Sequence, residues 1–222
     1  MYKIYGINNA TASKRGEGKN MTEKEVEGLL RESGAFLNGH FLYASKLHGS
    51  VYIEKFRALE DPNITSILAG EMIARADAAG IPRPRVVIGP MTGGALLAFE
   101  VARQIKAKAF FTEKMDGAME LRRGFQLEEG EAVWITEDVV NLGGSIQQVI
   151  DCIEVNGGRI SAALVLVDRS KGRVQLKAPF LPLLRVTDLI EYPPDQCPLC
   201  KQGVPLAALG GRKVITAKAD KK

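Results

Sequence analysis

The sequence of 222 residues contains only three cysteines and two histidines, and none of its apolar runs is long enough to span a membrane. Three cysteines cannot build the disulfide framework of a small secreted domain. The first twenty residues lack the apolar segment of a secretion signal, and a membrane helix needs about 20 consecutive apolar residues. We therefore expect a cytoplasmic protein that is not secreted and has no membrane partner.

A large excess of one charge sign is also absent. The chain has 30 Lys and Arg residues against 26 Asp and Glu residues, a formal net charge of +4, and part of the excess lies close to the two ends. A nucleic-acid-binding protein is expected to carry a basic stripe on a recognisable module, whereas charges in terminal tails are usually solvated. We expect no nucleic-acid partner.

What is present is the composition of a globular protein, with 45% hydrophobic and 25% charged residues. The spacing of apolar residues predicts a helix from Glu23 to Ser33, which begins with a capping box formed by Thr22 and Glu25. A hairpin or a pair of strands is expected around a polar turn at residues 46–50. The Asp61-Pro62 pair begins a second helix, because proline is tolerated in the first turn.

After Gly80, short apolar strands alternate with helices, a pattern that indicates an α/β fold with a parallel sheet. The predicted strands cover residues 85–88, 109–112, 132–136 and 162–167. Ligands of such sheets bind beyond the carboxyl ends of the strands, so the loops that follow these strands are the expected functional loops. From residue 179 the chain is rich in proline, and we expect it to form an irregular cover over the sheet.

The run VWITEDVVNLGGS at residues 133–145 is the strongest functional pattern. Two acids end a buried strand, and a glycine pair leads into a helix predicted from Ile146 to Asn156. The Gly143-Gly144 pair allows backbone N–H groups to turn toward an anion beside a helix N-terminus, so a phosphate fits there. The Glu137-Asp138 pair would accept hydrogen bonds from the hydroxyls of an attached sugar. The loop alone is equally compatible with a tight turn beside an ordinary charge pair.

Together with its flanks, this run resembles the phosphoribosyl diphosphate motif of the type I phosphoribosyltransferases. Residues 88–94 are similar to the family's diphosphate loop, and residues 111–114 with 121–125 are similar to its mobile catalytic loop. Further segments resemble the short bacterial and archaeal orotate phosphoribosyltransferases, at residues 39–52, 168–170 and 197–206. The resemblance extends from about residue 21 to residue 212, nearly the whole chain.

The resemblance implies a type I phosphoribosyltransferase fold, in which helices flank a central parallel sheet and the N-terminal region builds a small hood subdomain. The expected parts are a flexible extension at 1–20, the domain at 21–212 and a basic tail at 213–222. Within the domain we expect the hood mainly at 21–60, the core at about 61–178 and the C-terminal cover at 179–212. The resemblance also implies a homodimer, and Mg²⁺ held mainly through phosphoribosyl diphosphate with no protein ligand assigned.

The implied reaction transfers the phosphoribosyl group of phosphoribosyl diphosphate to orotate, giving orotidine 5′-monophosphate and diphosphate in pyrimidine biosynthesis. Lys114 is the implied catalytic residue, which reaches the diphosphate. Arg169 would pair with the orotate carboxylate, for which a planar bidentate donor is suited. Tyr52, Ile53 and Asn141 are the other implied orotate contacts. The implied phosphoribosyl diphosphate contacts are Lys114, Thr92, Gly93, Gly94, Glu137, Asp138, Val139, Val140, Asn141, Leu142, Gly143, Gly144 and Ser145.

Two alternatives stay open. The base could be a purine or another pyrimidine, although Arg169 favours an acidic base. The chain could also be a non-catalytic regulator that senses phosphoribosyl diphosphate. The family usually has Thr-Thr or Thr-Ala before the glycine pair, whereas this chain has Asn141-Leu142. The leucine side chain cannot form a hydrogen bond, so this departure leaves some room for the regulator. The retained Lys114 and the Arg122-Arg123 loop favour an enzyme.

The Cys197 and Cys200 pair has the spacing of half a zinc site. No second cysteine pair exists, and the two histidines, His40 and His48, lie far away in the sequence. We therefore expect a structural turn at the cysteines, without a metal ion.

Overall fold

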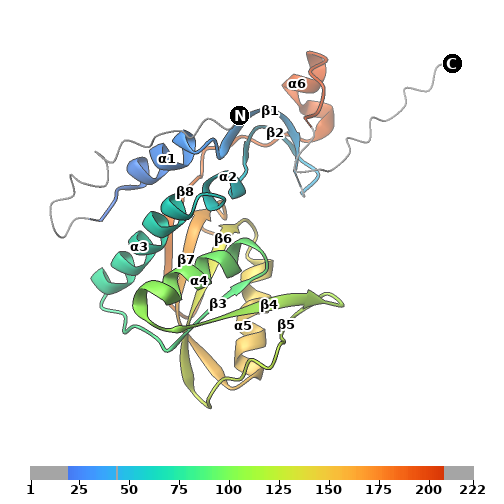
Figure 1. Cartoon of the computed structure of the whole chain (residues 1–222). Helices are drawn as coiled ribbons and strands as arrows, with labels where there is room; N and C mark the ends of the chain where they lie inside the picture. Colours follow the sequence, from blue (N-terminus) through green and yellow to red (C-terminus); the bar gives the residue numbers. More distant parts are fainter. Residues whose placement is uncertain (1–19, 44, 208–222) are drawn as a thin grey trace, which may run out of the picture.

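A six-stranded sheet forms the centre of the computed structural model, which describes residues 20–43 and 45–207 (Figure 1). The strand order is β5-β4-β3-β6-β7-β8, and all neighbouring strands are parallel except β4 and β5. The strands are β3 (Val86–Pro90), β4 (Lys108–Met115), β5 (Ala118–Leu121), β6 (Glu131–Val140), β7 (Gly158–Asp168) and β8 (Phe180–Arg185). The predicted α/β class is confirmed. The expected basic tail, and the expected extension apart from residue 20, lie outside the described residues.

Two helical layers cover the sheet because its central strands are apolar on both faces. Trp134 and Leu164 point to one face and pack in the cluster that contains α3 (Pro62–Ala78) and α4 (Gly93–Ile105). Val133 and Ile135 point to the opposite face, toward α5 (Gly144–Val155). Alternation along a strand places successive side chains on opposite faces, so β6 carries part of both cores.

The helix starts that the sequence predicted are present. In α1 (Glu23–Glu32), Thr22 and Glu25 form the predicted capping box, with the Thr22 side chain accepting from the backbone N–H of Glu25. The carboxylate of Asp61 accepts from the N–H of Asn63 at the start of α3, where Pro62 occupies the first turn. Both caps satisfy N–H groups that a helix leaves unpaired.

A small hood lies over the carboxyl edge of the sheet and is built on the predicted hairpin (Figure 1). Strands β1 (Phe36–Leu42) and β2 (His48–Ile53) pair in antiparallel fashion, and the short α2 (Phe56–Leu59) leads from them into α3. Near the C-terminus, η1 (Pro194–Gln196) and α6 (Pro198–Lys201) lie beside the hairpin. The first and last parts of the described chain therefore meet at the hood.

The expectation of an irregular cover from residue 179 is wrong for its first part. Phe180–Arg185 is strand β8, which pairs in parallel with β7 at the edge of the sheet. Leu183 and Leu184 are buried there. Pro182 suggested an irregular segment, but proline is tolerated in an edge strand, where its missing N–H removes no bond from the sheet interior.

Within residues 20–43 and 45–207, no helix combines the length and the apolar character that crossing a bilayer requires.

The topology marks one place for a ligand. Strands β3 and β6 are neighbours, but α4 after β3 packs on one face of the sheet and α5 after β6 packs on the other. Such a switch in direction leaves a crevice at the carboxyl ends of the two strands, and α/β proteins bind ligands there. Ile88 of β3 is level with Ile135 of β6, so the acids that follow Ile135 lie beside the loop that follows Pro90.

Candidate active site

Glu137 and Asp138 lie near the carboxyl end of strand β6, at the crevice. Strand β6 continues through Val140, four residues beyond the predicted end, so both acids belong to the strand itself. Glu137 is buried, and its Oε2 has no hydrogen-bond partner among the described residues. The Asp138 carboxylate lies 3.8 Å from the ammonium of Lys55, which follows the hood hairpin. The hood thus contributes a cation to the acid pair.

Burial raises the pKa of both acids. Desolvation, followed by the charge of neighbouring Asp138, raises the pKa of Glu137 to about 8. Desolvation also raises the pKa of Asp138, and the Lys55 ammonium opposes that shift. A buried carboxylate is costly unless it finds donors or a cation. The pair is therefore a site prepared for hydroxyl donors or a cation from a ligand.

The loop after β3 packs against these acids, and its glycines make the contact possible. A Cβ on Gly93 would overlap Oδ2 of Asp138, and a Cβ on Gly94 would lie 2.8 Å from the carbonyl oxygen of Thr136. The Thr136 hydroxyl also donates to the carbonyl oxygen of Gly94, at 2.9 Å. Only glycine permits this approach. Thr92 precedes the pair and is exposed, at the N-cap of α4.

The glycine pair after β6 forms the predicted turn into a helix. Gly143 is the N-cap of α5 with φ of 82°, a left-handed conformation that favours glycine. Its missing side chain also leaves room for Val174, which a Cβ would contact at 2.6 Å. The Asn141 and Leu142 side chains are exposed, and so are Gly144 and Ser145. Accessible N–H groups at a helix N-terminus can bind an anion, and the phosphate contact at this exposed turn stays a prediction.

Lys114 lies near the end of β4, at the same edge of the sheet as the acids of β6. Thr112 of β4 is level with Pro90 of β3, and β4 then continues to Met115 in an antiparallel hairpin with β5. The segment that resembles a mobile loop is thus a hairpin here. The Lys114 side chain is exposed and forms no ion pair within the described part of the chain. Its ammonium is available to a ligand.

Arg123, which follows β5, differs from Lys114 because it forms an ion pair. The Arg123 guanidinium donates to both carboxylate oxygens of Glu113, at 3.0 and 2.7 Å, and holds the pKa of that carboxyl below its usual value. Arg123 therefore closes the base of the hairpin. Exposed pairs of this kind contribute little to stability.

Arg169 follows β7 and is already engaged. Its guanidinium donates to Oε1 of Glu191 at 3.0 Å, and its Cζ lies 5.1 Å from the centre of the Tyr43 ring. Burial raises the pKa of the Tyr43 hydroxyl, which donates to the carbonyl oxygen of Val51. The hood hairpin and the C-terminal segment thus hold this guanidinium from two sides.

Tyr52 and Ile53 end the second strand of the hood. Ile53 is buried, whereas Tyr52 is half-buried and packs against Phe41 with 5.7 Å between ring centres. Among the described residues, no hydrogen bond, ion pair or ring contact joins either side chain to Arg169 or to the acids. Val139 and Val140 complete β6, and the carbonyl oxygen of Val140 accepts from the N–H of Arg169 at 2.7 Å.

The sequence reasoning missed three residues that contact the predicted ones. Lys55 contacts Asp138, and Tyr43 and Glu191 contact Arg169. Each comes from a segment far from its partner in the chain. The position of Lys55, two residues after the end of β2, was a signal in the sequence that could have identified it. No sequence pattern marked Tyr43 or Glu191.

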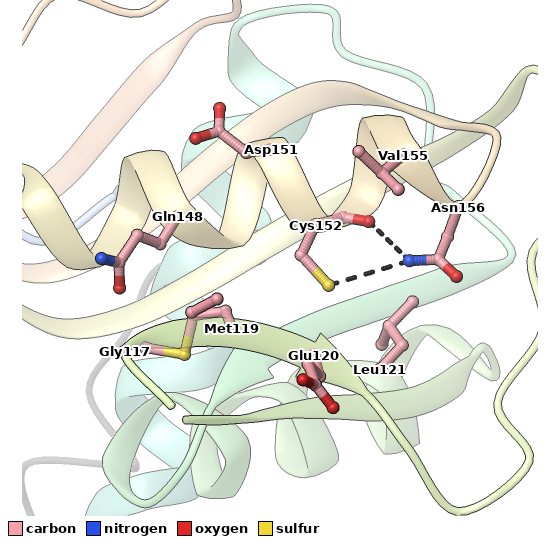
Figure 2. A pocket seen from close by; sticks show the side chains of 10 residues that line it. Gly117, Met119, Glu120, Leu121, Gln148, Asp151, Cys152, Val155 and Asn156 are labelled. Atoms are coloured by element: carbon pink, nitrogen blue, oxygen red, sulfur yellow. Dashed lines mark hydrogen bonds between the residues drawn. The ribbon is translucent and has the colours of Figure 1, made fainter. Parts of the chain in front are cut away.

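A hollow elsewhere on the molecule contains none of these residues. It has a volume of about 430 Å³ and lies between β5 and α5, lined by side chains that include Met119, Asp151 and Cys152. Figure 2 shows the amide of Asn156 donating to the carbonyl oxygen of Cys152 at its edge. Because it lies away from the carboxyl ends of β3 and β6, we do not place the chemistry there.

Known proteins are similar to this chain in sequence and in fold. The orotate phosphoribosyltransferase of Pelotomaculum thermopropionicum is 40% identical over 194 residues, which are 87% of this chain and 100% of the relative. That of Heliobacterium modesticaldum is 41% identical over 192 residues, 86% of this chain and 100% of the relative. No protein-family model matches the chain.

Solved structures agree. The orotate phosphoribosyltransferase from Aeropyrum pernix gives a TM-score of 0.58 at 27% identity and covers 72% of this chain and 93% of that chain. An adenine phosphoribosyltransferase from Saccharomyces cerevisiae gives a TM-score of 0.59 at 17% identity, covering 71% of this chain and 99% of that chain. The second likeness shows the fold alone.

The raised pKa of Glu137 predicts how stability depends on pH. The unfolded carboxyl ionises near its ordinary pKa of 4.5, whereas the folded one keeps its proton up to a pKa of about 8. Between these values the unfolded state releases a proton that the folded state retains, so rising pH lowers the free energy of unfolding. Glu137→Gln should remove this loss and make the ligand-free protein more stable than wild type at pH 8.

Urea denaturation at pH 5 and pH 8 measures this effect. Glu154→Gln on the exposed side of α5 is the matched control, and it should keep the pH dependence of the wild type. The same pH dependence in Glu137→Gln and wild type would contradict the prediction.

Proposed function

The chain belongs to the orotate phosphoribosyltransferase family, and we propose the following division of its reaction among the residues of the crevice. The enzyme transfers the phosphoribosyl group from phosphoribosyl diphosphate to orotate, giving orotidine 5′-monophosphate and diphosphate, a step of pyrimidine biosynthesis. The observation that carries this function is the 40% identity to curated orotate phosphoribosyltransferases over their full length. The acid pair beside two glycine turns at the switch point supports it.

Phosphoribosyl diphosphate would bind across the switch point. The ribose hydroxyls donate to Glu137 and Asp138, which supplies the donors that the buried Oε2 of Glu137 lacks among the described groups. The 5′-phosphate accepts from the backbone of the turn at residues 141–145, at the N-terminus of α5. The diphosphate lies along the turn at residues 92–94, where the missing side chains leave the main chain accessible.

The site fits Mg²⁺ as cofactor. The acid pair offers hard carboxylate oxygens, and Lys55 is the one cation that pairs with it among the described residues. Mg²⁺ prefers carboxylates together with substrate oxygens. We propose that the ion is held mainly through phosphoribosyl diphosphate. When bound, Mg²⁺ neutralises charge on the diphosphate.

The chemical step is a displacement at the anomeric carbon. A ring nitrogen of orotate forms a bond to this carbon while the bond to the diphosphate oxygen breaks. The diphosphate leaves with the bonding electrons and takes up the proton that the ring nitrogen loses. Lys114 donates to that leaving group, which gains charge as the bond breaks. The sugar gains oxocarbenium character as the bond to the diphosphate breaks. The hairpin of β4 and β5 would move over the crevice with Lys114 and exclude water from this reactive sugar.

Orotate would meet Arg169 at the rim of the crevice. The guanidinium is held by Glu191 and lies over the Tyr43 ring, so it is oriented before the substrate arrives. A free edge of the guanidinium can still donate to the orotate carboxylate, because the group carries five N–H donors. Tyr52, Ile53 and Asn141 would border the ring of the base.

We also propose a cytoplasmic homodimer. The resemblance to the family supports the dimer, since in related enzymes the mobile catalytic segment often reaches the site of a neighbouring subunit. The scarcity of cysteine supports the reducing compartment.

One assay tests the function directly. Orotate absorbance should fall when the protein is mixed with phosphoribosyl diphosphate and Mg²⁺, with one diphosphate released for each orotate consumed. A panel with adenine, guanine, hypoxanthine and uracil should show no comparable turnover. Binding of phosphoribosyl diphosphate without diphosphate release would support a regulator instead.

Lys114→Ala should lower turnover by about 10²-fold, the scale for losing one donor that stabilises charge in the transition state. The KM for orotate should change little, because Lys114 contacts the leaving group. Steady-state kinetics measure both values. Lys24→Ala on the exposed surface of α1 is the control and should keep wild-type turnover. Unchanged turnover in Lys114→Ala would remove this residue from the mechanism.

Arg169→Lys should raise the KM for orotate by about 10-fold or more, because a charged hydrogen bond contributes about 1.5–3 kcal/mol and lysine cannot reproduce its bidentate geometry. The affinity for phosphoribosyl diphosphate should stay within about 2-fold of wild type. Initial rates and equilibrium titration separate the two effects. Equal losses for both substrates would argue that Arg169 supports the fold rather than the base.

A further inference from the structure

Four side chains that the transfer reaction does not use lie together where the C-terminal segment meets the hood. They are His40 of β1, His48 of β2, Cys197 and Cys200. One ligand atom from each lies within 4.8 Å of all the others, and only Cys200 is exposed. The histidines are 149 to 160 positions from the cysteines in the chain, yet folding brings all four together.

The separations of these atoms match the edges of a tetrahedral zinc site. Nε2 of His40 is 2.9 Å from Nδ1 of His48 and lies 3.5 and 3.7 Å from the sulfurs of Cys197 and Cys200. Nδ1 of His48 is 3.3 Å from Sγ of Cys200. With Zn–N of about 2.05 Å and Zn–S of about 2.3 Å, the N–N edge is about 3.3 Å and the N–S edge about 3.5 Å. Each observed separation lies within about 0.5 Å of its edge.

The hydrogen bonding of His40 directs a lone pair into the cluster. Nδ1 of His40 lies 2.7 Å from the carbonyl oxygen of Val204, and this oxygen has no proton to give, so Nδ1 carries the hydrogen. Nε2 is then an acceptor, with three neighbours around it. One lone pair accepts one good hydrogen bond, whereas a cation at the centre uses a lone pair from every member. Histidines that bind metals commonly donate their other N–H to a backbone carbonyl in this way.

Backbone hydrogen bonds hold the two halves of the cluster together. His48 and Tyr192 exchange two of them, at 2.8 and 2.9 Å, and the N–H of Ala207 donates to the carbonyl oxygen of His40 at 2.7 Å. These contacts flank the cysteine turn on both sides. Figure 1 shows α6, which contains Cys200, beside the β1–β2 hairpin. The ligand atoms are therefore positioned by the fold and not by chance proximity of free side chains.

We propose that His40, His48, Cys197 and Cys200 bind one structural Zn²⁺, which fastens the segment at residues 192–207 to the hood hairpin. Two imidazoles with two thiolates in tetrahedral arrangement are characteristic of zinc. The two thiolates balance the charge of the ion, so the complex can be neutral at a mostly buried place. All four positions are taken by protein, which makes the site structural and not catalytic. This proposal replaces the sequence-based expectation of a turn without metal.

The proposed zinc site is linked to Arg169, the residue proposed to bind orotate. The hairpin that it fastens carries Tyr43, and the segment that it fastens follows directly after Glu191; these two residues hold Arg169. The metal thus stabilises the hood in the position seen here. The proposed zinc site does not depend on the transferase activity, because the ion takes no part in the reaction.

Metal analysis of the purified full-length chain tests the site. The protein is produced with a tag that contains no histidine and without added metal, and mass spectrometry of the elements measures its content. We expect one zinc per chain. Cys200→Ser, which changes the exposed ligand, should lower the zinc content at least 10-fold, whereas the matched control Cys152→Ser should keep it. X-ray absorption should show two sulfurs at about 2.3 Å and two nitrogens at about 2.0–2.1 Å.

A second measurement uses the wild-type chain and so does not depend on a variant that folds. Removal of zinc by a chelator, with Mg²⁺ then restored, should speed hydrogen exchange at the amides of His48, Tyr192 and Ala207, and added zinc should reverse the change. A disulfide between Cys197 and Cys200 in metal-free folded protein would overturn the proposal. Iron in place of zinc, equal zinc in Cys200→Ser and wild type, or unchanged hydrogen exchange would overturn it as well.

Discussion

The burial of β6 on both faces is the constraint on which the rest of the structure depends. Trp134 packs against the α3 and α4 layer, while Val133 and Ile135 pack against α5, so this strand joins the two cores. A strand held in this way cannot turn aside at its end, and it carries Glu137 and Asp138 into a place with little water. The cost of burying two carboxylates is set against the much larger gain from the apolar part of the same strand.

Two glycine-containing turns bring further backbone close to the acids of β6. Gly93 and Gly94 allow the loop after β3 to touch Asp138 and Thr136, and Gly143 allows the chain to leave β6 and enter α5 in one tight turn. The two glycine turns and the acid pair therefore lie together at the carboxyl ends of β3 and β6. A sugar that carries phosphates at both ends is the ligand that we propose for these groups.

The hood depends on contacts between the two ends of the described chain. Lys55 reaches Asp138 from the end of the hairpin, and Tyr43 with Glu191 holds Arg169. The cluster of His40, His48, Cys197 and Cys200 lies between the hairpin and the C-terminal segment. A metal ion there would hold the rim while the β4–β5 hairpin, on the other side of the crevice, stays free to move. A stable rim and a moving cover suit a reaction that must exclude water.

Local patterns in the sequence predicted much of this protein. The capping box at Thr22, the start of α3 at Pro62, the alternation of strands and helices, and the turn at Gly143 depend on neighbours within a few positions, and each was predicted correctly. Strand β8 was missed because Pro182 is acceptable only at a sheet edge, and an edge is defined by the whole sheet. Contacts of Lys55 with Asp138 and of the histidines with the cysteines join positions tens to more than a hundred residues apart. The sequence by itself determined the fold class and the family, since the alternation of strands and helices and the segments that resemble the family are local in the chain. Only the tertiary structure decided which distant side chains meet, because that depends on how the hood and the C-terminal segment pack.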